Sequence, residues 1–264
     1  MTARRAAVAG RPIGHSLSPT LHRAAYAALG LRDWTYDALD VGEDELGALF
    51  DAIRADEQWA GLSMTMPLKA EAVRRADAVD PLAARIGSAN TALRGPDGTI
   101  TVTTTDVDGL RAALAEARTG GSVAVLGSGG TARAAVAAVD PDVEVLVVAR
   151  SPERGDPVAA LHPRGVCVGW EGFGPADVAT VVSTVPAGVT AELAGRGWPA
   201  TTGLVDVVYS PWPTALAARA TASGARVVSG LVVLVAQAAR QVTLMTGAEA
   251  PLAAMRAAGE AALA

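Results

Sequence analysis

The 264-residue sequence carries a net charge of −5, and half of its residues are hydrophobic while only 4% are aromatic. This length favours two domains, and the core must consist largely of Ala, Val and Leu, as in α/β proteins whose parallel strands are buried on both faces. The acidic balance, without any run of basic residues, argues against a nucleic-acid or anionic-membrane partner.

The first predicted elements are a short strand over Ala6–Gly10, a polar loop and a helix. Ser18 before Pro19 predicts a helix N-cap with proline at the first helical position, and Gly30 predicts the helix end. Ser16 and Ser18 are two residues apart, so in an extended segment both hydroxyls point the same way. Beside a helix N-terminus they would hold a carboxylate well. An equally acceptable interpretation is that Ser18 only caps the helix and Ser16 only solvates the loop.

The next segment alternates between strand and helix patterns. Its expected elements are a strand over Trp34–Val41, a helix over Glu43–Ala55, a strand over Gly61–Met66 and a helix from Leu68 to about Asp77. Lys69 therefore lies in the first turn of a helix, where the dipole disfavours a cation. Such an ammonium is either simply solvated, which is the commoner case, or held there for a purpose.

A hairpin pattern follows, made of Ile86–Leu93, the turn Gly95–Gly98 and Thr99–Thr105. Asn90 falls within the first of these strands, where a buried amide needs hydrogen-bond partners. Asp106 closes the second strand and precedes a helix over Leu110–Arg118. We expect the junction between the two domains at this point.

A glycine turn organises the second half of the chain. Val123–Leu126 predicts a buried strand, followed by a turn and an Ala-rich helix from Thr131. Gly127 allows the tight turn, Gly129 lets the backbone approach a pyrophosphate, and the helix N-terminus offers N–H donors. Because Val143–Val148 predicts the second strand of a βαβ unit, we favour dinucleotide binding over an ordinary βα loop.

The residues after that second strand indicate which dinucleotide is bound. An acidic residue there would accept a hydrogen bond from the ribose 2′-OH of NAD, but this chain has Arg150, Ser151 and Arg154 nearby. Guanidinium groups suit a 2′-phosphate, so the pattern favours NADP. The alternative is a solvated helix start with exposed arginines.

The remaining strands are expected over Val178–Thr184, Gly203–Tyr209 and Arg226–Ser229, with polar ends at the carboxyl edge of a parallel sheet, where ligands bind. Helices over Gly230–Thr246 and Pro251–Leu263 are expected to return to the first domain. The sequence thus predicts an N-terminal α/β domain and a Rossmann-type doubly wound sheet. His15 and His22 have no partners at metal or triad spacing, so we expect neither a metal site nor a catalytic histidine.

Four separated segments make the chain resemble the NADP-dependent shikimate dehydrogenase family over nearly its whole length. They are Gly14–Pro19, Ser63–Lys69, Thr105-Asp106 with Gly109, and Leu234–Ala238. The resemblance implies a substrate domain of residues 1–105 with 238–264, an NADP-binding domain of residues 106–237, and a cleft between them.

The resemblance also implies a role for each matching residue. Ser16 and Ser18 would hold the substrate carboxylate with Tyr209, whereas Thr65, Asn90 and Gln237 would bind ring hydroxyls. Lys69 and Asp106 would form the catalytic pair. The pyrophosphate would lie on Gly127, Ser128, Gly129, Gly130 and Thr131, the 2′-phosphate on Arg150, Ser151 and Arg154, and the nicotinamide beside Val207 and Gly230.

The chain departs from the family pattern at Ser63, Thr104 and Ser229, where the family usually has Asn, Asn and Asp. These departures bear on substrate preference and turnover more than on reaction type. The alternatives are a quinate or broad-specificity dehydrogenase and a non-catalytic NADPH-binding regulator. We expect a cytoplasmic protein, because the single Cys167 forms no internal disulfide, the N-terminus lacks a signal-peptide pattern and no apolar run spans a bilayer. The expected oligomeric state is a monomer or a homodimer.

Overall fold

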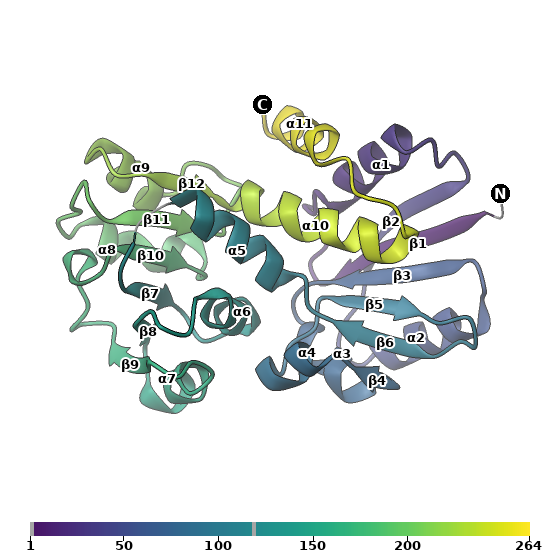
Figure 1. The fold of residues 1–264 in the computed structure, drawn as a ribbon, viewed down its shortest axis with the longest axis horizontal. Helices are drawn as coiled ribbons and strands as arrows, with labels where there is room; N and C mark the ends of the chain where they lie inside the picture. Colours follow the sequence, from purple (N-terminus) through teal and green to yellow (C-terminus); the bar gives the residue numbers. More distant parts are fainter. Residues whose placement is uncertain (1–2, 118–119) are drawn as a thin grey trace. The chain divides into compact units, whose positions relative to one another are not determined.

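Two compact units make up the part of the chain that the structure describes, residues 3–117 and 120–264 (Figure 1). In this computed structural model the first unit comprises the chain up to Thr105 together with Leu234–Ala264, and the second comprises Asp106–Val233. The boundaries expected from the sequence fall at 105/106 and 237/238. The second division instead falls at Leu234, inside the long helix α10 (Gly230–Thr246).

The first unit contains a six-stranded mixed sheet in the order β2-β1-β3-β5-β6-β4 (Figure 1). Its strands are β1 (Arg4–Gly10), β2 (Trp34–Asp40), β3 (Trp59–Met64), β4 (Ala78–Val79), β5 (Thr91–Arg94) and β6 (Ile100–Thr103). β1 is parallel to β3, whereas β5 is antiparallel to both β3 and β6, which confirms the hairpin. The carboxyl ends of β1, β3 and β6 and the start of β5 therefore lie at one edge of this sheet.

Helices cover both faces of this sheet. They are α1 (Ser18–Ala28), α2 (Leu46–Ala55), α3 (Lys69–Arg75), α4 (Pro81–Ile86) and the part of α10 from Leu234, while α11 (Leu252–Leu263) packs on α1. Val8 of β1 packs with Tyr26 of α1 and Met245 of α10, while its neighbour Ala9 packs with Phe50 of α2. Successive residues of a strand point to opposite faces, so the apolar run of β1 is buried on both.

The second unit is a parallel sheet in the order β12-β11-β10-β7-β8-β9. Its strands are β7 (Val123–Leu126), β8 (Val145–Ala149), β9 (Gly165–Gly169), β10 (Thr180–Ser183), β11 (Gly203–Asp206) and β12 (Val227–Ser229). Counted from β7, this is the 3-2-1-4-5-6 order of the doubly wound dinucleotide-binding fold, which confirms the expected fold class. The order reverses between β7 and β10, so ligands are expected at the carboxyl ends of these two strands.

The helices of the second unit are α5 (Asp106–Ala117), α6 (Gly130–Ala138), α7 (Pro152–Ala159), α8 (Ala191–Ala194) and α9 (Ala215–Ala222), with 3₁₀ turns at Pro175–Asp177 and Ala187–Thr190. Leu126, Val181 and Leu204 of the sheet pack with Leu216 and Ala220 of α9. Among the described residues, no helix is both long and apolar enough to cross a membrane, and no three His, Cys, Asp or Glu residues group as metal ligands.

Three predicted boundaries near the site are wrong. Ser18 is already the first residue of α1, and the cap position is Leu17, whose side chain makes no capping hydrogen bond. The stretch before Asn90 is not a strand, because Asp80 caps α4 with its carboxylate and Gly87, at φ +64°, ends that helix. Asp106 begins α5 rather than closing β6.

Other element ends differ by a few residues from the sequence pattern. α2 begins at Leu46 rather than at residue 43, and β3 ends at Met64, which leaves Thr65 in the loop before α3. β11 ends at Asp206, so Val207 and Tyr209 lie in the loop that follows it. Arg118, the expected end of the helix after Asp106, lies outside the described residues.

Candidate functional site

Polar residues of the first unit gather where β1, β3 and β6 end and β5 begins. Backbone hydrogen bonds join the segments that carry them. Thr65 N donates to Ala9 O over 2.9 Å, and Asn90 N donates to Thr103 O over 3.1 Å. Gly10 must be glycine here, because a Cβ would lie 2.3 Å from the Thr65 side chain. One rigid sheet edge therefore carries the loop after β1, Thr65 and Asn90.

Asn90 is the centre of the hydrogen bonding at this edge and is 1% exposed. Its Oδ1 accepts from Thr105 N over 2.8 Å and from Thr91 Oγ1 over 2.9 Å. Its Nδ2 donates to Thr105 Oγ1 over 3.0 Å and to Gln237 Oε1 over 2.8 Å. The structure thus brings together Asn90 and Gln237, two predicted substrate ligands that lie far apart in the sequence.

Ser16 and Ser18 lie on a turn rather than on an extended segment. Ser16 N donates to Ile13 O over 3.0 Å, and Ser18 N donates to Ser16 Oγ over 3.3 Å. Leu17 between them has helical dihedral angles, φ −83° and ψ −4°. The alternation expected for an extended pair is therefore wrong, and the two serines are coupled by a hydrogen bond at the start of α1. Their contact with a carboxylate stays a prediction.

Lys69 and Asp106 each begin a helix. Lys69 is half-buried at the start of α3, as expected, and its carbonyl accepts from Ala89 N over 2.9 Å, next to Asn90. Asp106 is 4% exposed at the start of α5, where a carboxylate suits the helix dipole. Lys69 belongs to the first unit and Asp106 is the first residue of the second, so their pairing stays a prediction.

Two of the three departures from the family pattern lie in this unit. Ser63 is buried on β3, where its hydroxyl accepts from Tyr36 OH over 2.7 Å and donates to Gln241 Oε1 over 2.9 Å. Thr104 is also buried, and its hydroxyl has no hydrogen-bond partner among the described residues. Tyr36 and Gln241 therefore complete the hydrogen bonding of Ser63, whereas the Thr104 hydroxyl is left unsatisfied. Neither Tyr36 nor Gln241 shows a motif of its own in the sequence.

The glycine turn of the second unit has the backbone that a dinucleotide requires. Gly127 follows β7 with φ +116°, and a Cβ on it would lie 2.7 Å from Thr184 Oγ1. A Cβ on Gly129 would meet nothing within 4 Å, so the space beside it is open. Gly129 is the N-cap residue of α6, whose first N–H groups point out of the helix. The turn fits a pyrophosphate.

A cavity of about 240 Å³ lies at this turn, at the carboxyl ends of β7, β8 and β10. Five predicted cofactor ligands line it: Gly127, Ser128, Gly129, Arg150 and Arg154. Among the residues that the structure describes, the lining carries two guanidinium groups and no carboxylate. This set suits the 2′-phosphate of NADP better than the 2′-OH of NAD. Gly130 and Thr131 begin α6 directly after the lining glycines.

Ser151 is not among the residues that line this cavity, although it lies next to Arg150, and several unpredicted residues do line it. Ser151 is the N-cap residue of α7, and the Glu153 backbone N–H together with the Ser151 hydroxyl lowers the pKa of Glu153. The cavity is also lined by the unpredicted residues Trp170, Thr184, Val185, Pro186 and Val189. Thr184 could have been found from the sequence, because it lies at the polar end of the strand that precedes Pro186. No sequence motif marks Trp170, which follows the edge strand β9.

Val207 and Gly230 are neighbours beyond the ends of β11 and β12. A Cβ on Gly230 would lie 2.0 Å from Val207 O, so only glycine fits this contact. Asp206, which the sequence analysis did not single out, accepts from Thr214 Oγ1 over 2.7 Å and from Val208 N over 3.2 Å. Burial raises the pKa of this carboxyl. Asp206 therefore anchors the loop that carries Val207 and Tyr209, whose roles stay predictions.

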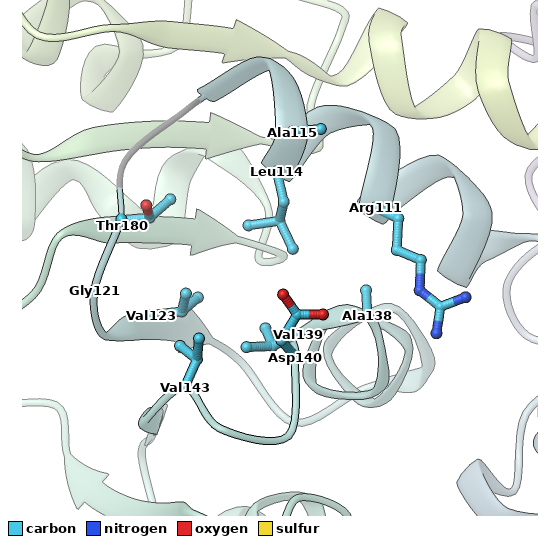
Figure 2. Close-up of a pocket in the computed structure, with 11 residues that line it drawn as sticks. Arg111, Leu114, Ala115, Gly121, Val123, Ala138, Val139, Asp140, Val143 and Thr180 are labelled. Carbon is cyan, nitrogen blue, oxygen red and sulfur yellow. The ribbon is translucent and has the colours of Figure 1, made fainter.

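A second hollow of the same unit lies at the opposite edge of its sheet (Figure 2). Its lining includes Val123 and Thr180, the first residues of β7 and β10, and Leu114 of α5. Arg111 lies to one side of the apolar side chains in Figure 2. No predicted site residue lines this hollow, which is consistent with ligand binding at the other edge.

Comparisons with known proteins give one consistent result. A family model described as shikimate dehydrogenase substrate binding domain matches residues 8–92, and one described as shikimate 5′-dehydrogenase C-terminal domain matches residues 230–258. The NADP⁺ shikimate dehydrogenase of Methanosarcina acetivorans is 37% identical over 92% of this chain and 93% of its own length.

Solved structures agree with the sequence comparisons. Shikimate dehydrogenase of Mycobacterium tuberculosis aligns with a TM-score of 0.88 and 40% identity, covering 98% of this chain and 99% of that one. The enzyme of Thermus thermophilus, solved in complex with NADP(H) and shikimate, aligns with a TM-score of 0.87 and 31% identity, covering 98% and 100%.

Proposed function

Because the chain belongs to the shikimate dehydrogenase family, we propose that it catalyses the reversible NADPH-dependent reduction of 3-dehydroshikimate to shikimate, a step toward chorismate and the aromatic amino acids. The observation that carries this proposal is the convergence of family segments on one sheet edge. Four parts of the chain meet where β1 and β3 end and β5 begins. They are the loop that follows β1 and the residues Thr65, Asn90 and Gln237.

The cofactor is NADP. When bound, NADPH supplies the hydride that the ketone carbon receives. The glycine turn offers backbone N–H groups to the pyrophosphate, and Arg150 and Arg154 line the same cavity without a competing carboxylate. Ser151 adds a hydroxyl at the start of α7, and the nicotinamide lies beside Val207 and Gly230, whose backbones are in close contact.

Lys69 is the proton donor of the reduction. Negative charge grows on the ketone oxygen as its carbon gains the hydride, and the Lys69 ammonium transfers a proton to that oxygen, forming the hydroxyl of shikimate. In the reverse direction the neutral amine removes this proton. Lys69 is the only lysine among the 22 basic residues of the chain. Arginine, used at every other such position, does not deprotonate in proteins and could not perform the reverse step.

Asp106 acts together with Lys69, and the remaining ligands hold the substrate. The Asp106 carboxylate accepts from the Lys69 ammonium and from the neighbouring substrate hydroxyl, which orients both groups for proton transfer. Thr65, Asn90 and Gln237 bind ring hydroxyls. Ser16 and Ser18, with Tyr209, bind the carboxylate through hydroxyl donors, and the backbone N–H of Ser18, which donates to Ser16 Oγ, holds the Ser16 hydroxyl beside Ser18.

Two alternatives differ in substrate or in class. A quinate or broad-specificity dehydrogenase would use the same hydride chemistry. Ser63, where the family usually has Asn, donates to Gln241, which in turn donates to the Asn90 carbonyl, so this departure bears on the proposed substrate ligands. A non-catalytic NADPH-binding regulator would keep the cofactor cavity without turnover. The presence of Lys69, Asp106 and all the predicted polar ligands favours the enzyme.

One experiment separates these functions. The purified protein is mixed with shikimate or quinate and with NADP⁺ or NAD⁺, and formation of reduced nicotinamide is followed by absorbance. We expect the highest kcat/KM with shikimate and NADP⁺. A preference for quinate would select the first alternative, and NADPH binding without turnover on either acid would select the regulator.

We also propose that the enzyme works in the cytoplasm, as a monomer or homodimer. The single Cys167 supports a reducing compartment, since it forms no disulfide within the chain. Burial and the neighbouring Asp156 raise the pKa of its thiol, which keeps it protonated and unreactive. Light scattering of the purified protein measures the oligomeric state, and cell fractionation tests the location.

A further inference from the structure

The two amides that carry the proposed contacts with ring hydroxyls, Asn90 and Gln237, each have one end that donates and one that accepts. Which end faces which neighbour decides what the amide can offer a ligand. Backbone groups settle this question, because a backbone N–H can only donate and a backbone C=O can only accept. Two backbone groups at the sheet edge act in this way.

The first is the N–H of Thr105. It donates to Asn90 Oδ1 over 2.8 Å, so the Oδ1 end of Asn90 faces Thr105. The Nδ2 end then faces Gln237, where it donates to Oε1 over 2.8 Å. This contact occupies the accepting end of Gln237. The Nε2 end, with its two N–H donors, is left on the side away from Asn90.

The second is the C=O of Asn90. It accepts from Gln241 Nε2 over 3.3 Å, and the same Nε2 donates to Thr91 Oγ1 over 3.0 Å. The Oε1 end of Gln241 therefore faces Ser63, whose hydroxyl donates to it over 2.9 Å. Tyr36 OH donates to Ser63 Oγ over 2.7 Å and ends the chain of hydrogen bonds.

Burial makes this arrangement costly to break. Gln241 and Ser63 are each 3% exposed, and Thr91 and Tyr36 are fully buried. Water therefore cannot replace a lost partner, and an unsatisfied polar group in this region is expensive. Gln241 lies one helical turn after Gln237 on α10, so the two side chains share a helix face.

We propose that Gln241 is a positioning residue that holds Asn90 in the orientation in which Gln237 presents its amide N–H groups to a ring hydroxyl of the substrate. This inference rests on the proposed function. Gln241 itself touches no substrate: it acts through the Asn90 carbonyl and through Thr91, whose hydroxyl donates to Asn90 Oδ1 over 2.9 Å. The substrate group that meets Gln237 must then be able to accept a hydrogen bond.

The first test removes the polar ends of Gln241 but keeps its size. Dissociation constants of shikimate and NADP⁺ are measured by calorimetry, with the matching KM values, for wild type and Gln241→Met. We expect shikimate binding to weaken about tenfold, the loss typical of one or two hydrogen bonds. Binding of NADP⁺, whose proposed ligands lie in the second unit, should change by less than about twofold, which also reports that the variant is folded.

A matched control lies on the same helix. Thr243 is half-buried, and its hydroxyl donates along α10 to Ala239 O over 3.2 Å, outside the hydrogen-bonded set of Gln241. Thr243→Val should leave both affinities within about twofold of wild type. An equal loss of shikimate affinity in the two variants would overturn the proposal, because it would reflect a general weakening of the helix.

The second test reverses the hydrogen-bond polarity by pH. In Gln241→Glu the protonated carboxyl can donate to Asn90 O, one of the two acceptors of Gln241 Nε2, and accept from Ser63, whereas the ionised form can only accept. We expect shikimate affinity close to that of wild type at low pH, and a falling ratio to wild type as pH rises. Tyr36 stays neutral because burial raises its pKa, and His22, stacked on Tyr36, has a pKa lowered to about 4.

The outcomes separate this inference from the proposed function. Wild-type shikimate affinity in Gln241→Met, or in Gln241→Glu an affinity as far below wild type at low pH as at high pH, would overturn the positioning role. If wild type binds shikimate but does not oxidise it, the proposed function fails, and the affinity ratios still decide the role of Gln241. If wild type does not bind shikimate, both are wrong.

Discussion

The backbone N–H of Thr105 donates to Asn90 Oδ1 over 2.8 Å, and the next residue along the chain, Asp106, begins α5. One amide of the first unit therefore holds the residue that directly precedes the helix with the proposed catalytic carboxylate. Because Asn90 also donates to Gln237, a change at this residue is expected to affect substrate binding and turnover together.

Replacing Lys69 by alanine should abolish proton transfer. We expect Lys69→Ala to lower kcat by about 10²-fold or more, with a much smaller change in the KM for shikimate, because loss of a general acid affects mainly the transition state. Arg74→Ala, which removes an exposed cation from the same helix, is the control. Steady-state kinetics with shikimate and NADP⁺ check this, and an unchanged kcat in Lys69→Ala would rule out the role.

Chemical labelling offers an independent check on the same residue. Since Lys69 is the only lysine, an amine-directed acylating reagent can modify only this side chain and the N-terminal amine. We expect activity to fall in proportion to acylation of Lys69, as measured by peptide mass spectrometry. Adding shikimate together with NADP⁺ should slow both the acylation of Lys69 and the loss of activity. Full activity after complete acylation of Lys69 would contradict the mechanism.

Arg150 should discriminate between the two nicotinamide cofactors. Removing one guanidinium that contacts a phosphate costs about 1.5–3 kcal/mol, so Arg150→Ala should weaken NADP⁺ binding by at least about tenfold and leave NAD⁺ binding little changed. Arg164→Ala is the matched control, because Arg164 pairs with Glu144 on the surface, outside the cavity. Calorimetric titration of both nucleotides measures the effect. Equal losses for NADP⁺ and NAD⁺ would contradict recognition of the 2′-phosphate.

Two glycines of the turn should respond differently to the same substitution. A Cβ on Gly129 meets open space, so Gly129→Ala should keep the melting temperature within about 2 °C and weaken NADP⁺ binding, because the methyl group occupies the space of the pyrophosphate. Gly127→Ala should lower both the melting temperature and the affinity for NADP⁺, because the added Cβ would collide with Thr184 and because the residue has a positive φ. Thermal denaturation with and without NADP⁺ tests the pair. Wild-type NADP⁺ affinity in Gly129→Ala would argue against a pyrophosphate at the turn.

His22 should make the fold sensitive to acid. Its ring is fully buried against Tyr36, its Nδ1 donates to Ser18 O over 2.9 Å, and burial lowers its pKa from 6.5 to about 4. The unfolded chain therefore takes up this proton before the folded one as pH falls. The stability present above pH 6.5 is lost progressively down to about pH 4, by roughly 3 kcal/mol.

Urea unfolding at pH 7 and pH 4.5 measures this contribution. Wild type should lose more stability between the two pH values than His22→Phe, which keeps a stacked ring but cannot be protonated. His15→Gln replaces an exposed histidine and should behave as wild type. An identical pH dependence in wild type and His22→Phe would show that the buried imidazole does not govern acid stability.

Local patterns in the sequence were enough for the glycine turn of the second unit and for the strand and helix beside it. The strand over Val123–Leu126, the glycine turn and the Ala-rich helix are contiguous, and their periodicity reports directly on backbone conformation. The arginines after β8 line the same cavity as the turn because parallel strands place their carboxyl ends side by side. Around Asn90 the same reasoning failed, because the capping of α4 by Asp80 outweighed a weak strand pattern.

The sequence alone determined the α/β class, the glycine turn, the preference for NADP and the family, because each depends on residues close together in the chain or on short motifs. Only the tertiary structure decided that Asn90 meets Gln237, and that Gln241, Ser63 and Tyr36 complete the same set of hydrogen bonds. These contacts depend on how α10 packs against the sheet, and packing between distant segments leaves no periodic pattern in the sequence.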